Sequence, residues 1–154
     1  RSRRQRQMCI RDRMKMDYDK LIEKRNNEGG FSEFCGIKIT KIKEGCAEAE
    51  VQVNTEHFNS MSIIHGGMLF TLADTVGGAC ARSHGYNVTT VNANIEFLQA
   101  GANVETLYAY AKTVSKGNKI YRVQVDIFDQ LKHHLTTSVL TFYTGSNPAP
   151  VTFE

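Results

Sequence analysis

A single acidic residue, Asp74, lies within the long apolar stretch from His65 to about His84. If this stretch is a helix, Asp74 shares one side with small or apolar residues, namely Gly67, Phe70, Gly77, Gly78 and Ala81. No basic residue stands three or four positions from Asp74. Burial disfavours the charge of such a carboxylate, and perturbed carboxylates concentrate at functional sites. Asp74 is therefore the candidate catalytic residue, and an acid on a solvated helix surface is the ordinary alternative.

The residues His65, Gly66 and Gly67 stand where an irregular loop is expected to become this helix. The first backbone N–H groups of a helix have no partner within it, and they coincide with the positive end of its dipole. Glycine lets a carbonyl oxygen approach such an N–H without a Cβ in the way. The pattern predicts a site that stabilises an oxyanion, and a flexible Gly-Gly hinge is the alternative.

The other side of the predicted helix is apolar and should face a core; it holds Met68, Leu69, Leu72, Val76, Ala79 and Cys80. Gly77 and Gly78 each weaken a helix by roughly 1 kcal/mol relative to Ala. We therefore expect another backbone to approach the helix closely at this pair, such as that of a second subunit.

Alternating apolar and polar residues predict half-buried antiparallel strands on both sides of this helix. The expected order is one short helix, two strands, the long helix and four strands. The short helix and the strands cover residues 14–27, 36–43, 46–54, 89–98, 104–115, 119–129 and 133–144. No βαβ repeat is present, so we predict an α+β fold in which a single antiparallel sheet wraps the long central helix.

The composition predicts one globular domain over residues 14–147, followed by a tail over 148–154. Residues 1–13 hold six arginines and one acid, so the net charge of +3 belongs to this leader. The leader is predicted to be disordered or an artefact, with a basic arm for RNA or an anionic surface as the alternative. Because the remaining residues carry more acidic than basic groups, the domain shows no footprint for nucleic acid.

The chain has no run of about 18 apolar residues and no signal-peptide core, so we expect no membrane association and a cytoplasmic protein. Its four cysteines, Cys9, Cys35, Cys46 and Cys80, have neither CxxC spacing nor a histidine at metal-ligand spacing. They are predicted to be reduced thiols, mostly small core residues, rather than ligands of a metal or members of a disulfide framework.

The segment HGGMLFTLAD resembles the HGG-x4-L-x-D signature of hotdog-fold thioesterases, of the phenylacetate-degradation type related to 4-hydroxybenzoyl-CoA thioesterases. The resemblance includes Asn59, six residues before the histidine, and the segment TTVNANIEFLQAG, and it covers about residues 33–145. It implies an acyl-CoA thioesterase that needs no cofactor, because coenzyme A is part of the substrate. It also implies homodimers that join their sheets edge to edge and pair into tetramers.

In this family picture Asp74 comes from one subunit and Gly66 from the other. The Gly66 N–H, helped by Asn59, binds the thioester oxygen. Asp74 acts as general base on water or attacks the carbonyl directly.

Supporting roles follow from the same resemblance. His65 orders the loop on the substrate side, and Thr90 places a hydroxyl near the attacking water. Gly67 and Phe70, on the same side of the helix as Asp74, are expected to contact the substrate. A capping histidine and an ordinary strand threonine are the alternatives for His65 and Thr90.

Two features depart from the family pattern or admit another function. The chain has Gln-Ala-Gly where many relatives have a Pro-Gly turn, and no residue defines the acyl group. His57-Phe58 resembles part of the His-Phe-Pro segment of hotdog dehydratases, so an acyl dehydratase or hydratase is an alternative. A non-catalytic acyl-CoA-binding regulator is a further one. Four basic residues could meet the CoA phosphates or be ordinary surface charges: Arg82, Lys116, Lys119 and Arg122.

Overall fold

A computed structural model describes residues 16–148 of the chain. The predicted leader over residues 1–13 lies outside the described residues, and so does the predicted tail over 148–154 apart from Pro148, which ends the last strand. The elements, in chain order, are α2 (Tyr18–Asn27), α3 (Phe31–Phe34), β1 (Ile37–Lys43), β2 (Cys46–Gln52), the 3₁₀ turn η1 (Thr55–His57), α4 (Gly66–Arg82), β3 (Tyr86–Phe97), β4 (Thr106–Lys116), β5 (Ile120–Asp129) and β6 (His134–Pro148).

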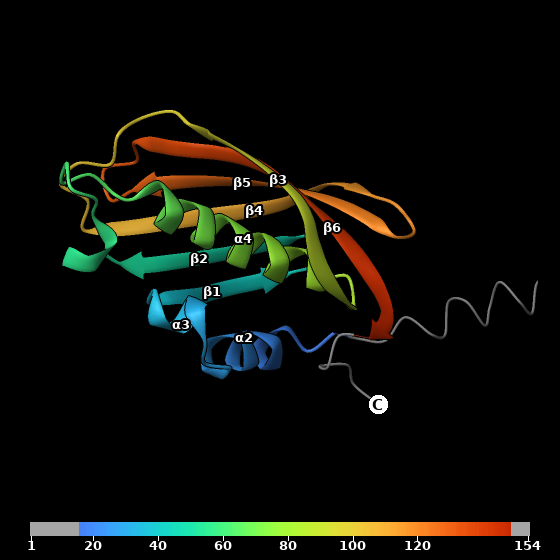
Figure 1. Ribbon diagram of the computed structural model, residues 1–154. Coiled ribbons are helices and arrows are strands. Elements are labelled where there is room, and N and C mark those ends of the chain that lie inside the picture. Colours follow the sequence, from blue (N-terminus) through green and yellow to red (C-terminus); the bar gives the residue numbers. More distant parts are fainter. Residues whose placement is uncertain (1–15, 149–154) are drawn as a thin grey trace, which may run out of the picture.

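All six strands form one sheet in the order β1-β2-β4-β5-β6-β3, and every neighbouring pair is antiparallel. The sheet curves around α4, while α2 and α3 lie beside β1 (Figure 1). This arrangement confirms the predicted α+β hotdog fold. Within residues 16–148 no helix is long and apolar enough to cross a membrane.

The apolar side of α4 is buried against the sheet as predicted: Met68, Leu69, Leu72, Val76, Ala79 and Cys80 are each at most 7% exposed. Within the chain, side chains rather than another backbone approach Gly77 and Gly78, and the approach of a second subunit stays a prediction. A Cβ at Gly77 would lie 3.3 Å from the ring of Phe142 and 3.4 Å from Val125, so side chains of β6 and β5 of the same chain fill this space. Glycine is needed here because a large ring packs directly on the helix backbone.

The two edge strands of the sheet, β1 and β3, differ in whether their outer backbone groups are hydrogen-bonded. At β1 the side chain of Asn26, from α2, donates to the Ile39 carbonyl at 2.9 Å and accepts from the Ile39 N–H at 2.8 Å. The amide side chain thus forms both backbone hydrogen bonds of Ile39 that a neighbouring strand would otherwise form. At β3, a twelve-residue strand pairs only with β6, and Val91 on it is 56% exposed. Such a long unpaired edge is a template for pairing with another chain.

Element boundaries differ from the predicted ones by a few residues. The first helix begins at Tyr18, because the Asp17 side chain caps it by accepting from the Lys20 N–H. The short helices α3 and η1 were not predicted. Of the cysteines within the described residues, Cys35 and Cys80 are buried and Cys46 is exposed, and all three are free thiols as expected.

Candidate active site

Asp74 lies half-buried in the middle of α4, and β3 crosses the helix beside it. The Thr90 hydroxyl on β3 donates to the Asp74 Oδ1 at 2.6 Å. This short bond to a charged acceptor fixes the orientation of the carboxylate. It leaves Oδ2 without a partner in the part of the chain that the structure describes. Asp74 therefore presents one oriented and available oxygen, the arrangement that a general base or a nucleophile needs.

Arg82 lies two turns further along the same side of α4, where burial lowers its pKa and the Asp74 charge acts in the opposite direction. Its guanidinium passes close over Gly78, because a Cβ there would lie 3.0 Å from Nη1. Nη2 donates to the Val88 carbonyl at 3.4 Å. Arg82 is thus a half-buried cation that helps balance Asp74, rather than a free surface charge.

The start of α4 is built as the oxyanion prediction requires, with one difference. His65 is the N-cap, and its Nδ1 accepts from the Gly67 N–H at 2.8 Å. A Cβ at Gly67 would lie 3.0 Å from this ring, so glycine is needed for the cap to form. The Gly66 N–H, by contrast, has no hydrogen-bond partner among residues 16–148. Of the two glycine amides, Gly66 is the one available to a ligand.

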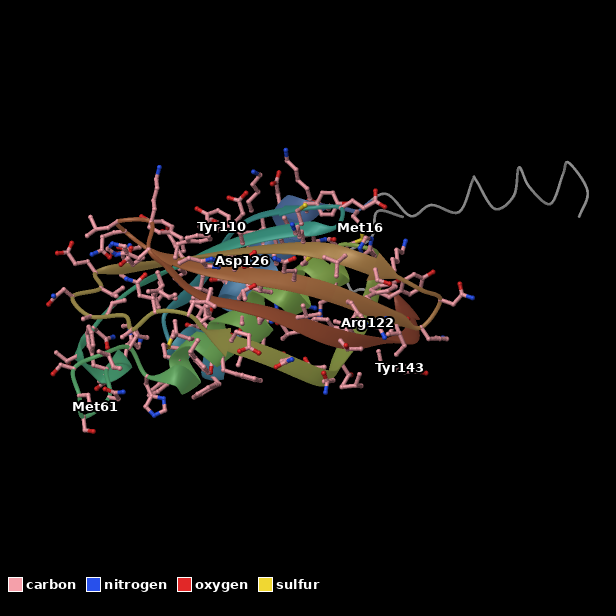
Figure 2. All side chains as sticks on the ribbon, turned by 90° about the horizontal axis from the view of Figure 1, so that it is seen from above. Met16, Met61, Tyr110, Arg122, Asp126 and Tyr143 are labelled. Carbon is pink, nitrogen blue, oxygen red and sulfur yellow. The ribbon has the colours of Figure 1, made fainter. Side chains whose placement is uncertain are left out.

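The loop before α4 is held by two residues of the predicted set. The Asn59 Oδ1 accepts from the N–H groups of Met61 and Ile63, at 2.9 and 3.3 Å. The His65 N–H donates to the carbonyl of His57 at 2.9 Å. Figure 2 shows Met61 at the tip of this loop. Asn59 therefore shapes the loop with its oxygen, and its role toward an oxyanion, through the amide nitrogen, stays a prediction.

Phe70 lies on α4 between the two reactive positions and is 41% exposed. It is thus accessible as a substrate contact, as is the backbone around Gly67, and both assignments stay predictions. The ring of Phe97, at the end of β3, covers Gly66: a Cβ on Gly66 would lie 3.3 Å from it. On β3, Thr90 therefore lies beside Asp74, and Phe97 lies beside Gly66.

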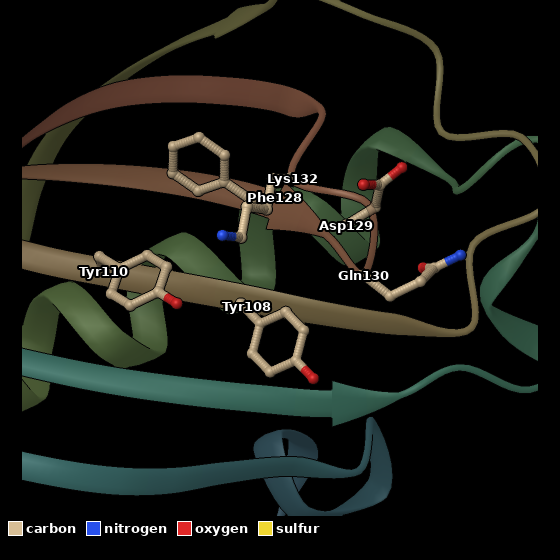
Figure 3. Close-up of a pocket in the computed structure, with 6 residues that line it drawn as sticks. All are labelled: Tyr108, Tyr110, Phe128, Asp129, Gln130 and Lys132. Atoms are coloured by element: carbon tan, nitrogen blue, oxygen red, sulfur yellow. The ribbon is translucent and has the colours of Figure 1, made fainter.

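Among the cavities of the described residues, two lie on opposite sides of the sheet. The outer one, of about 450 Å³, is lined by Tyr108, Tyr110, Phe128, Asp129, Gln130 and Lys132. Its aromatic rings project from β4 and β5 on the side away from α4 (Figures 2 and 3). It contains none of the predicted site residues.

The second cavity, of about 340 Å³, lies between α3, η1 and the first turns of α4, and its wall includes Phe31, Phe34, Cys35, His57, His65 and Met68. It borders the Gly66 amide through the neighbouring residues His65 and Gly67. The sequence did not single out this cavity, because α3 is a four-residue helix without a detectable period. Within residues 16–148, no group of three or more His, Cys, Asp or Glu side chains is placed to hold a metal ion.

An antiparallel sheet around a helix that carries an oriented carboxylate is the architecture of hotdog-fold thioester hydrolases, and comparisons with known proteins identify the family. The Thioesterase superfamily matches residues 61–133. The acyl-coenzyme A thioesterase PaaI of Escherichia coli is 32% identical over 95 residues, which are 62% of this chain and 68% of PaaI. A protein of Archaeoglobus fulgidus, provisionally named an esterase, is 30% identical over 120 residues, 78% of each chain. The chain belongs to the thioesterase superfamily and is a thioester hydrolase.

Solved structures confirm the PaaI-like hotdog fold. The E. coli PaaI protein, from the phenylacetic acid degradation operon, superposes with a TM-score of 0.73 at 26% identity, over 76% of this chain and 85% of PaaI. A hypothetical thioesterase of Streptococcus pneumoniae, crystallised with coenzyme A, gives 0.70 at 26% identity, over 73% of this chain and 88% of that protein. The same thioesterase was also solved as an Asp→Ala and as a Thr→Ala variant, at positions sixteen residues apart.

Proposed function

We propose that the protein hydrolyses acyl-CoA thioesters to a free acid and coenzyme A, with Asp74 as general base and the Gly66 N–H as oxyanion donor. The observation that carries the proposal is the half-buried Asp74 carboxylate, oriented by the Thr90 hydroxyl at 2.6 Å. The Asp and Thr replaced in the S. pneumoniae thioesterase have the same sixteen-residue separation as Asp74 and Thr90. That this relative was crystallised with coenzyme A supports acyl-CoA as the substrate class.

The free oxygen of Asp74 takes a proton from water while the water oxygen attacks the thioester carbonyl. The carbonyl π electrons move to oxygen, and the Gly66 N–H stabilises the resulting anion. When the carbonyl re-forms, the C–S bond breaks, and the sulfur leaves and receives the proton held by Asp74. Direct attack by Asp74 on the carbonyl is the other route, and it would pass through an acyl anhydride on this residue.

Both groups cannot act on one thioester within a single chain. Gly66 and Asp74 are eight residues apart on α4, which separates them by about 12 Å along the helix axis. A carbonyl carbon must lie about 3 Å from its nucleophile while its oxygen contacts the donor. The site is therefore completed by a second copy of the chain.

The open edge of β3 supplies the geometry for this second copy. Thr90 marks Asp74 on this strand, and Phe97 marks Gly66. If two β3 strands pair in antiparallel fashion about a twofold axis near Ala93, Thr90 of one chain lies opposite the partner's Phe97. Asp74 then lies beside the partner's Gly66, and the dimer contains two equivalent sites. Association of such dimers into tetramers stays a prediction.

The test is release of free thiol from a panel of acyl-CoA thioesters by the wild type and by Asp74→Asn. We expect the substitution to lower kcat by about 10²-fold or more, because a general base contributes about 10²–10⁴. The variant should keep its oligomeric state, measured by light scattering, and its affinity for the substrate. Wild-type turnover by Asp74→Asn would refute the assignment. Absence of thiol release by the wild-type protein from every thioester would refute the proposed function itself.

A further inference from the structure

The cavity between α3, η1 and the start of α4 combines an apolar wall with a buried polar group that has no assigned role. Phe31 and Phe34 are 66% and 77% exposed at its mouth, and their rings stack with centroids 6.3 Å apart. Cys35 and Met68 line it as well, each 7% exposed. Exposed aromatic rings above a buried apolar wall are typical of small-molecule sites, and a volume near 340 Å³ suits a small ligand.

His57 supplies the polar group. It lines this cavity and is only 6% exposed. Its Nδ1 accepts from the Asn54 N–H at 3.1 Å, which closes the capping box of η1. A neutral histidine whose Nδ1 accepts a hydrogen bond carries its proton on Nε2. No residue of the described chain accepts from that Nε2–H, and this nitrogen is not among the side-chain atoms sealed from solvent, so the donor is open to a ligand that enters the cavity.

The position of the cavity indicates what that ligand is. His65 and Gly67 in its wall flank Gly66, the residue whose free N–H is assigned to the thioester oxygen. A thioester with its oxygen on this N–H therefore lies beside the cavity. Glu56, also in the wall, disfavours acyl groups that end in a carboxylate.

We propose that this cavity binds the acyl group of the thioester, and that the His57 Nε2–H donates a hydrogen bond to an oxygen substituent on it. The inference rests on the proposed function and names its substrate class, which is a compact, uncharged acyl group with a hydroxyl or oxo oxygen. A ligand in the cavity shields this donor from water, so the site discriminates against an analogue that lacks the acceptor and leaves the donor unpaired.

The test compares acyl-CoA pairs that differ in one oxygen, such as hexanoyl-CoA and 3-hydroxyhexanoyl-CoA. The wild type should prefer the hydroxylated member by about tenfold in kcat/KM, the worth of one buried hydrogen bond. His57→Asn retains an oxygen at the position of Nδ1, so it keeps the cap of η1 but removes the donor, and its preference should fall to about one. His57→Gln extends an amide to the position of Nε2, so it should retain the preference while losing the cap.

Thermal unfolding reports on the cap of η1, which only His57→Gln loses, and the substrate preference reports on the Nε2–H donor, which only His57→Asn loses. If His57 is only structural, removal of the Nε2–H will not change the substrate preference. The ratio of kcat/KM values for the two acyl-CoA substrates will then be equal in His57→Asn and the wild type. That result would overturn the proposal even where both proteins hydrolyse acyl-CoA.

The apolar wall is tested with Phe34→Ala, for which the outer cavity offers the matched control Tyr110→Ala. We expect Phe34→Ala to lower kcat/KM for hexanoyl-CoA several-fold more than kcat/KM for acetyl-CoA, because acetyl is too short to reach the ring. Tyr110→Ala should change neither rate. The opposite pattern would place the acyl group in the outer cavity and refute the inference. Asp74→Asn reports on hydrolysis alone. If this variant loses turnover but substitutions at His57 and Phe34 do not change the substrate preference, the proposed function stands and only the acyl site is rejected.

Discussion

The proposed division of the site between two chains can be tested with a hybrid dimer of two inactive variants. Gly66→Pro is suited to remove the oxyanion donor. Proline is well tolerated as the first residue of a helix, and it favours an extended residue before it. His65 already has that conformation, with φ −62° and ψ 133°. Because the Gly66 N–H has no partner within residues 16–148, its removal breaks no hydrogen bond of the described fold.

Loss of one oxyanion donor lowers kcat by about 10²–10³-fold. Gly66→Ala is the control, since it adds a Cβ that meets the same Phe97 ring at 3.3 Å but keeps the N–H. We expect the alanine variant to be far more active than the proline variant. Similar losses in both variants would mean that the ring contact, rather than the N–H, matters at this position.

The hybrid pairs a Gly66→Pro chain with an Asp74→Asn chain, each with a different affinity tag, after co-expression and two-step purification. If Asp74 works with the partner's Gly66, one of the two sites in each hybrid is intact and the other lacks both groups. The purified hybrid should then show about half the wild-type kcat, while each parent homodimer is at least about 10²-fold slower. A hybrid no faster than its parents would refute a site shared between chains.

Further predictions concern single residues. Thr90→Val should lower kcat by about tenfold to a hundredfold, the worth of a hydrogen bond to a charged group, and an unchanged rate of thiol release would contradict the orienting role. Burial lowers the pKa of His84 below 6.5, so below that pH the unfolded chain binds more protons and the free energy of unfolding falls with acidity. Urea unfolding of His84→Gln should show a smaller decrease between about pH 7 and pH 5, and equal slopes would contradict this. Burial raises the pKa of Cys80 to about 11, so iodoacetamide should modify the exposed Cys46 before Cys80, as peptide mass mapping will show. Gly77→Leu should destabilise the fold by about 1–3 kcal/mol or more through overpacking, and a melting temperature equal to that of the wild type would argue against the close packing there.

The elements that carry the chemistry were predictable because their signals are local and periodic. The apolar stripe of α4 located the core side of the helix, and the loop-to-helix transition at Gly66 located the free amide. The alternation on β3 placed Thr90 on a strand, whereas a hydroxyl near the attacking water followed only from the family resemblance, and the hydrogen bond to Asp74 was not predicted. These predictions needed only the geometry of single elements.

Features that depend on contacts between distant residues could not be read from the sequence. Gly77 indicated a close approach, but nothing local to it identifies Phe142, sixty-five positions later, as the side chain involved. His57 stood out only through its likeness to a dehydratase segment, whereas in the structure its Nδ1 caps η1 and its ring lines a cavity. That cavity also needs α3, whose single turn has no period to detect.

The amide of Asn26 on β1 has a consequence for how large the assembly can become. The proposed pairing through β3 joins two sheets into one with twice as many strands. Both edge strands of the joined sheet are then β1. Each end already has its Ile39 backbone groups occupied by Asn26, at 2.9 and 2.8 Å. In the proposed dimer, a further chain that paired with β1 would have to displace Asn26 from Ile39, which disfavours growth beyond two copies and so disfavours fibres of a protein with a long exposed strand.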